Sequence, residues 1–110
     1  MKIEQEAVDT WIKTYGIRYF NEMTNTVLLM EEVGELSRYI ARIYGEQSFK
    51  NTEDQVNAKE HIKEELGDIL FVLICLSNQM EIDLDQVFKD NLEKKTKRDF
   101  KRHLENIKLK

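Results

Sequence analysis

The sequence of 110 residues contains no proline, and glycine occurs at only four positions. Proline breaks helices and glycine weakens them, so few positions oppose a regular helical backbone. Charged residues make up 35% of the chain, which gives long helices ample polar surface. Together these features predict an all-α protein.

Cysteine and long apolar runs are also scarce. The single Cys75 cannot form an internal disulfide and lies in an apolar run, which favours a reducing compartment, and we expect a cytoplasmic protein. The longest apolar run, ILFVLICL at 69–76, falls far short of the roughly 20 residues that span a bilayer. The first residues, MKIEQEAVDTW, are too charged for a signal peptide. We therefore expect no membrane partner.

An excess of positive charge is missing as well. The formal net charge is −4, which gives no general attraction to nucleic acid. A chain of this length forms one domain, expected here over 1–110, with a core small enough that a partner chain would add to its stability.

Apolar periodicity, glycine positions and capping residues predict four helices. An Asp83 N-cap with Gln86 three residues later should open the last of them. The expected helices cover about 2–15, 22–44, 57–80 and 83–105, with a polar connection between the second and third.

The third predicted helix is apolar around its whole axis at 69–76, so it must be covered on every side. Three neighbouring helices of a small chain can hardly provide that cover. We therefore expect a four-helix, bundle-like fold built into a homo-oligomer, a dimer or tetramer. Phe71 and Ile74 are the residues predicted to lie at its interface.

Two segments place carboxylates beside a core stripe: LLMEEVGELSR at 28–38 and KEELGDILF at 63–71. At about 100° per residue, each segment has one acid at the rim of the core, a second one turn further on, and a third turned outward. In that order the acids are Glu32, Glu35 and Glu31 in the first segment, and Glu65, Asp68 and Glu64 in the second.

This arrangement is costly, because acids four residues apart repel and a carboxylate at a core edge loses hydration. A solvated face paired with Arg38 and Lys63 is the simpler interpretation for either segment alone. Two copies at matching angles instead favour a metal site. Its expected oxygen ligands are Glu32, Glu35, Glu65 and Asp68.

Hard oxygen ligands suit Mg²⁺, for which Mn²⁺ may substitute. A di-iron bundle needs Glu-x-x-His pairs, and neither His61 nor His103 follows a glutamate at that spacing. Zinc is disfavoured by a chain with one cysteine and two scattered histidines.

The predicted fourth helix carries a stripe that changes from apolar to basic along one face. Solubility explains such a stripe poorly, whereas an anion held between this helix and the acids explains it well. The stripe comprises Leu84, Val87, Phe88 and Asn91, followed by Lys95, Arg98 and Arg102.

The two acidic segments and the basic segment that follows them resemble the motifs of a known family. EEVGE at 31–35 followed by ELGD at 65–68 resembles the EExxE…ExxD signature of the MazG-like nucleotide pyrophosphohydrolases, members of the all-α NTP pyrophosphatase superfamily. NLEKKTKR at 91–98 resembles the basic segment that follows in those proteins, and the similarity covers roughly 20–105.

The resemblance implies an all-α fold, obligate oligomers and Mg²⁺-dependent cleavage of nucleoside triphosphates to monophosphate and pyrophosphate, with deoxynucleotides or modified nucleotides as expected substrates. It assigns the metal to the four acids already chosen by angle. It assigns the phosphates to Lys95 and Arg98, and we add Asn91 as a substrate contact. Glu31 or Glu64 is the expected acceptor of the proton from the attacking water.

Two rival functions stay open: a non-catalytic helical module that binds a partner, and a regulator that binds nucleotide without hydrolysing it. Two features have alternative interpretations. Trp11 is expected in the core, with stacking on a nucleobase as the alternative. GEQSFK at 45–50 is either a surface connection or a loop that closes over the base.

Overall fold

The computed structural model describes residues 1–110 and contains four α-helices and no strand, which confirms the predicted fold class. A π-helical turn, Ile12–Gly16, extends the first helix, and a 3-10 turn, Ile107–Leu109, follows the last. No helix is both long and apolar enough to cross a membrane. The helices are α1 Lys2–Trp11, α2 Glu22–Tyr44, α3 Thr52–Gln79 and α4 Leu84–Glu105.

Helix α3 begins five residues earlier than the predicted start at 57. Asn51 is its N-cap, and the side-chain oxygen of Asn51 accepts a hydrogen bond from the Asp54 backbone N–H at 2.8 Å. Glu53 and Asp54 lie in the first turn, where negative charge is favourable. The connection between α2 and α3 is therefore shorter than the sequence suggested, and the capping signal in NTED was overlooked.

The predicted cap of α4 is confirmed, but its partner is not. The Asp83 side chain accepts a hydrogen bond from the Asp85 backbone N–H at 3.0 Å. Gln86 donates instead to Asp90, one turn further along the helix, at 2.9 Å. Asp83 thus satisfies one free N–H of the first turn without a reciprocal capping box.

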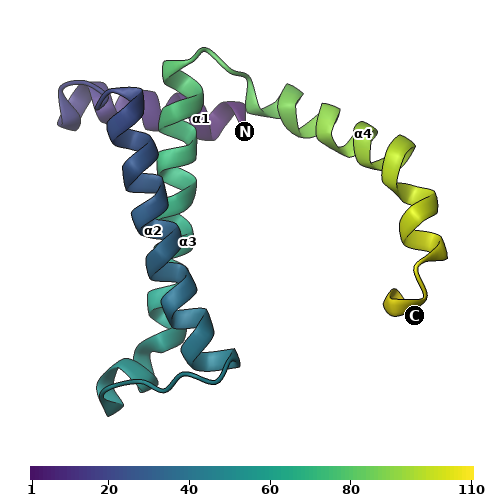
Figure 1. Cartoon of the computed structure of the whole chain (residues 1–110). Coiled ribbons are helices and arrows are strands. Elements are labelled where there is room, and N and C mark those ends of the chain that lie inside the picture. The colour runs from purple at the N-terminus through teal and green to yellow at the C-terminus, as the bar shows by residue number, and fades with distance from the viewer.

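Helices α2 and α3 form an antiparallel pair, and α1 crosses one end of it (Figure 1). The Phe71 ring meets the Trp11 ring edge-on at 5.6 Å between centroids, and Ile74 is buried. The prediction that Ile74 lies at a subunit interface was wrong, because the chain buries this residue itself, whereas Phe71 is half-buried and packs on Trp11. Leu70 and Leu73 on α3 stay 46% and 43% exposed, so it is their side of the helix that lacks cover.

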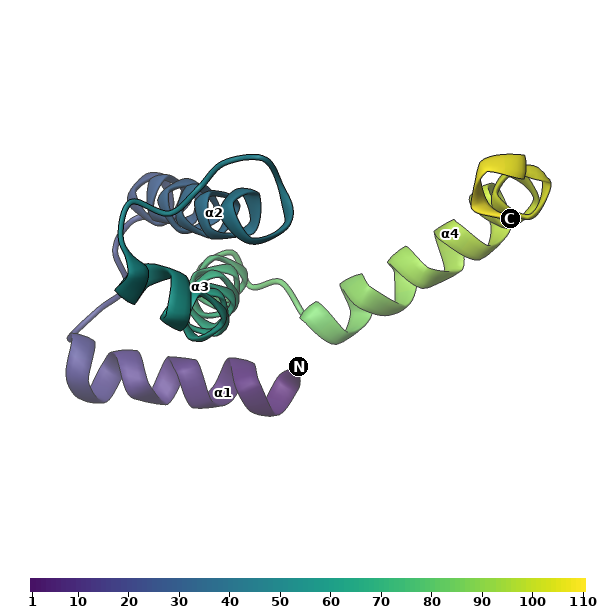
Figure 2. The ribbon, with the colours of Figure 1, turned by 90° about the horizontal axis from the view of Figure 1, so that it is seen from below.

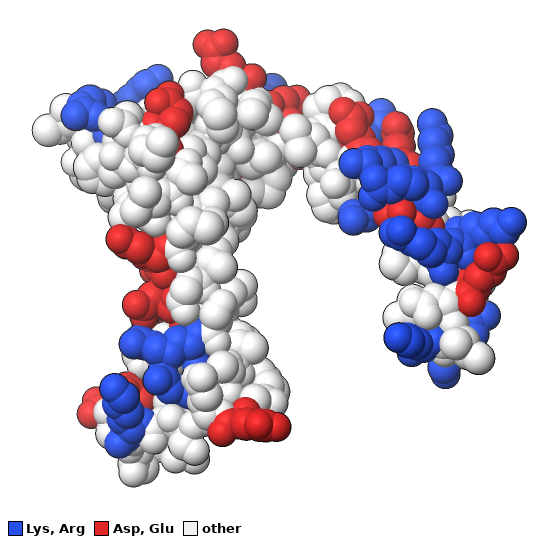
Figure 3. Space-filling model, viewed as in Figure 1, with Lys and Arg blue, Asp and Glu red and all other residues white.

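Helix α4 leaves the other helices after its first turn and extends away from them (Figures 1 and 2). Its apolar residues Val87 and Phe88 are 49% and 64% exposed, so the predicted buried face of this helix is uncovered within one chain. Lysine and arginine side chains crowd much of its surface, as the space-filling view shows (Figure 3). Beyond its first turn, which α1 contacts, this helix of apolar start and basic continuation packs on no other helix of the chain.

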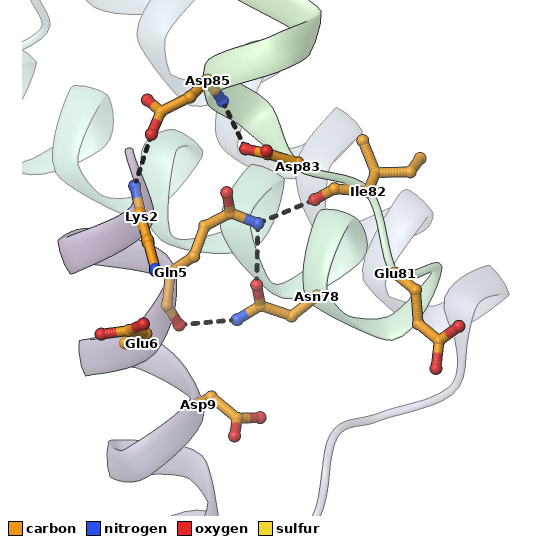
Figure 4. Close-up of a pocket in the computed structure, with 9 residues that line it drawn as sticks. All are labelled: Lys2, Gln5, Glu6, Asp9, Asn78, Glu81, Ile82, Asp83 and Asp85. Atoms are coloured by element: carbon orange, nitrogen blue, oxygen red, sulfur yellow. Dashed lines mark hydrogen bonds between the residues drawn. The ribbon is translucent and has the colours of Figure 1, made fainter.

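Polar side chains fasten α1 to the turn between α3 and α4 (Figure 4). Gln5 donates from its side-chain amide to Asn78 Oδ1 at 3.0 Å and to the Ile82 carbonyl at 2.9 Å. Asn78 returns a bond from its own amide to the Gln5 carbonyl at 2.9 Å, and the Leu84 backbone N–H donates to Gln5 Oε1 at 3.0 Å. These bonds fix the N-terminal helix against the start of α4.

A strained turn follows the π-helical segment. Ile17 has φ 70° and ψ −59°, and the Arg18 backbone N–H donates to the Gly16 carbonyl at 2.8 Å. These values describe a γ-turn of the rare type in which a β-branched residue is disfavoured. The Ile17 side chain is 88% exposed and gains little burial in return.

Ile17→Gly should therefore stabilise the protein. We expect the free energy of unfolding to rise by about 1 kcal/mol and the melting temperature by about 4 °C, because glycine adopts positive φ without strain. Thermal unfolding followed by circular dichroism measures the change. Ile17→Val keeps the branched Cβ and should leave the melting temperature unchanged; equal stabilisation by both variants would contradict the strain.

Candidate functional site

Three carboxylates from α2 and α3 converge between the two helices. Glu32, Glu65 and Asp68 each offer an oxygen, and these three oxygens lie within 4.8 Å of one another. Glu32 and Glu65 are half-buried, whereas Asp68 is more exposed. The antiparallel packing of α2 on α3 brings them together about half-way along the pair.

The crowding of these acids disfavours their ionised forms. A hydrogen bond with Glu32, burial, and the charges of Glu32, Asp68 and Glu35 raise the pKa of Glu65 to about 7. Burial and the charge of Glu32 also raise the pKa of Asp68. When Glu32 and Glu65 are both ionised, the buried Glu65 Oε2 has no hydrogen-bond donor from the chain. A cation would offset the repulsion between the carboxylates and would give this buried oxygen a partner.

Glu35, the fourth predicted ligand, stands beside this cluster rather than in it. Its carboxylate forms an ion pair with Arg38 at 2.8 Å, and both side chains are partly exposed. Glu31 and Glu64, the predicted proton acceptors, are exposed and also lie outside the three-acid cluster. Glu64 has the His61 ring for a neighbour, with 3.9 Å between Oε2 and Nδ1.

The predicted phosphate contacts lie on α4, which one chain does not bring to the acids (Figure 2). Arg98 pairs with Asp99 through two bonds of 2.9 and 3.2 Å, and this carboxylate raises the pKa of the Arg98 guanidinium. Lys95 is exposed. Asn91 borders a hollow between α3 and the apolar start of α4.

A cavity of about 460 Å³ opens directly beside the acids, and Glu32 and Asp68 line it. Its other walls are largely apolar and aromatic, and Trp11 is one of them. Trp11 is 49% exposed, so its predicted place in the core was wrong: its ring borders the cavity and packs on Phe71. The sequence reasoning also missed Asn25, a buried polar residue of this wall two turns before Glu32.

Comparison with known proteins identifies the family. The profile of the MazG nucleotide pyrophosphohydrolase domain matches residues 20–103. The chain belongs to the MazG nucleotide pyrophosphohydrolase family. The expected resemblance is thereby confirmed over α2, α3 and nearly all of α4, the helices that carry every predicted site residue.

Two proteins of Bacillus resemble this chain in sequence and in structure. The uncharacterized protein YpjD of Bacillus subtilis is 38% identical over 99 residues, which cover 90% of this chain and 86% of YpjD. A crystal structure of YPJD superposes with a TM-score of 0.72, covering 84% of this chain and 91% of that one. The crystal structure of a Bacillus-conserved MazG protein, a nucleotide pyrophosphohydrolase, has a TM-score of 0.71 and 35% identity, covering 91% and 93% of the two chains.

The raised pKa of Glu65 predicts that the metal-free protein loses stability as the pH rises. The folded chain keeps this proton up to about pH 7, whereas an unfolded glutamate releases it near 4.5, so each step upward between these values favours unfolding. In the presence of a chelator, the melting temperature should fall from pH 5.5 to pH 7.5, and this fall should be larger for the natural chain than for Glu65→Gln.

Glu60→Gln provides the matched control for this measurement. Glu60 is exposed on the same helix, and its bond to Lys63 lowers its pKa, so it stays ionised across this pH interval. This variant should keep the pH dependence of the natural chain. A Glu65→Gln protein with the same dependence would contradict the crowding of the three acids.

Proposed function

We propose that this MazG protein hydrolyses nucleoside triphosphates to nucleoside monophosphate and pyrophosphate in a Mg²⁺-dependent reaction, as one domain over 1–110. Deoxynucleoside or modified nucleoside triphosphates are the proposed substrates, which makes the protein a housekeeping enzyme of the nucleotide pool. The observation that carries the proposal is the convergence of Glu32, Glu65 and Asp68 around a buried, unpaired oxygen in a chain of this family.

The donor set fits a hard divalent cation. Glu32, Glu65 and Asp68 offer only carboxylate oxygens, the ligands that Mg²⁺ and Mn²⁺ prefer. Glu35 would complete the set by exchanging its ion pair with Arg38, a surface bond of little strength, for the cation. When bound, Mg²⁺ supplies positive charge against the phosphates and lowers the pKa of a neighbouring water.

The chain's own side chains then have distinct tasks. Water attacks the α-phosphorus, and Glu31 or Glu64, both exposed, accepts its proton. Asn91, Lys95 and Arg98 hold the phosphates. Because α4 points away from the acids of its own chain, these three residues would serve the site of a second copy.

A homo-oligomer supplies that second copy and covers the exposed apolar surface. Leu70 and Leu73 of α3 face a hollow of about 580 Å³ that Val87 and Phe88 of α4 also line. Leu66 continues the exposed stripe of α3, one turn before Leu70, and is 52% exposed. Burying one such side chain contributes about 1.5–3 kcal/mol, so helix packing between copies would be strongly favourable. The proposed partners are thus nucleotide and further copies of the chain, without nucleic acid or membrane.

The enzymatic proposal is tested by following pyrophosphate release from a panel of nucleoside triphosphates with and without Mg²⁺. Asp68→Asn should lower the rate at least a hundredfold, because an amide gives a cation a weaker ligand and no charge. Glu35→Ala should also lower the rate. Glu60→Gln should not, because Glu60 is exposed and is not part of the acidic cluster.

Two results would overturn this assignment. Full activity in both Asp68→Asn and Glu35→Ala would show that these carboxylates take no part in the reaction. Nucleotide binding without pyrophosphate release, under any divalent cation, would instead favour a regulator that holds the nucleotide and does not hydrolyse it.

The oligomer is tested by Leu70→Glu and Phe88→Glu, one on each side of the hollow. Each should shift the molar mass measured by light scattering toward the monomer and reduce activity with it, because a buried charge opposes the packing. Val56→Glu is the control: Val56 is 75% exposed on α3 outside this hollow, and its variant should remain assembled. An active monomer of the natural chain would contradict the proposal.

A further inference from the structure

Asn25 is the one buried polar residue in the wall of the cavity beside the acids, and its orientation is fixed. It is 4% exposed, and its amide nitrogen donates to Gln79 Oε1 at 2.8 Å and, at 3.4 Å, to the Phe20 carbonyl. The Gln79 amide nitrogen also donates to the Phe20 carbonyl. A backbone carbonyl only accepts, so it fixes Gln79, and Gln79 in turn fixes Asn25.

This orientation leaves one atom of Asn25 without a partner. Both amide hydrogens are directed toward Gln79 and Phe20, so the nitrogen offers nothing further to a ligand. Asn25 Oδ1 accepts no hydrogen bond from the chain, yet it is not among the fully enclosed unpaired atoms. Asn25 lines the cavity, and Oδ1 is its only polar side-chain atom without a partner, so the group it has left for a ligand there is an acceptor.

The position of Asn25 relative to the acids suits a nucleoside. Asn25 and Glu32 both line the cavity and are seven residues apart on α2, which places them on one face about 10 Å apart along the helix axis. A triphosphate held at the acids would direct its sugar and base along this face toward Asn25. Trp11 and Phe71 line the same cavity and offer aromatic surface, on which every nucleobase can stack.

Resting on the proposed function, we propose that this cavity holds the nucleobase and that Asn25 Oδ1 selects bases with an amino group at their far edge. Cytosine and adenine present an N–H donor there, which the free oxygen accepts. Uracil and hypoxanthine present a carbonyl at the same place, so two acceptors face each other and neither is satisfied. The site thus discriminates amino bases from keto bases through one oriented amide.

The test separates base selection from hydrolysis by using nucleosides, which carry no phosphate. Trp11 is the single tryptophan of the chain and borders the cavity, so its fluorescence reports binding there. Cytidine should bind roughly tenfold more tightly than uridine, and adenosine more tightly than inosine by a similar factor. The ratio of kcat/KM for dCTP over dUTP should change in the same direction.

Two variants test the oriented amide. Asn25→Leu removes the acceptor at similar size and should bring the cytidine-to-uridine ratio close to one. Gln79→Leu keeps Asn25 but releases its amide, which can then turn its nitrogen toward a keto base, so the preference should shrink or invert. If Asn25 had a purely structural role, both variants would instead bind cytidine and uridine more weakly by the same factor, and the ratio of the two affinities would stay unchanged.

Equal binding of cytidine and uridine by the natural chain, or no response to any nucleoside, would overturn the base selection. Either result leaves pyrophosphate release as a separate question. Conversely, a clear cytidine preference in a protein that releases no pyrophosphate would refute the proposed hydrolysis and retain the base site.

Discussion

The mutual repulsion of Glu32, Glu65 and Asp68 is the constraint around which this molecule is organised. The α2–α3 pair places three acids at one level of its interface, two of them half-buried, and leaves a Glu65 oxygen without a donor. Burial and like charge both oppose ionisation there, which the raised pKa of Glu65 and Asp68 expresses. A stable fold gains nothing from this arrangement, whereas a site for a cation and its phosphates requires it.

Helices α1 and α4 differ in how they lie relative to the three acids of the α2–α3 pair. Helix α1, fastened by Gln5 and Asn78, covers one side of α3 and contributes the Trp11 wall of the adjoining cavity. Helix α4 carries its basic residues away from the acids and leaves apolar surface exposed on both sides of the hollow it shares with α3. A single chain thus holds the acids and the cavity, and the proposed second copy would bring the phosphate contacts.

The sequence predicted the elements governed by local signals. Helical periodicity located α2 and the angular relation of Glu32 to Glu65 and Asp68, because the two helices pack side by side where these acids lie. Features that depend on packing between helices were not predicted from the sequence. Periodicity did not reveal that Trp11 would pack on Phe71, that Ile74 would be buried within the chain, or that α4 would diverge. It also did not reveal that Glu35 would pair with Arg38. Asn25 was missed because its role follows from Gln79, distant in sequence.

Binding of a divalent cation by the three carboxylates is the central claim, and calorimetry of Mg²⁺ binding tests it most directly. Titrations at pH 7 in two buffers with different heats of ionisation yield both the affinity and the number of protons released. Saturable binding with release of a fraction of a proton is predicted, because the raised pKa of about 7 keeps part of the Glu65 population protonated at that pH and the carboxyl must ionise to serve as a ligand. Absence of binding, or binding with no proton release that persists in Glu65→Gln, would contradict the account.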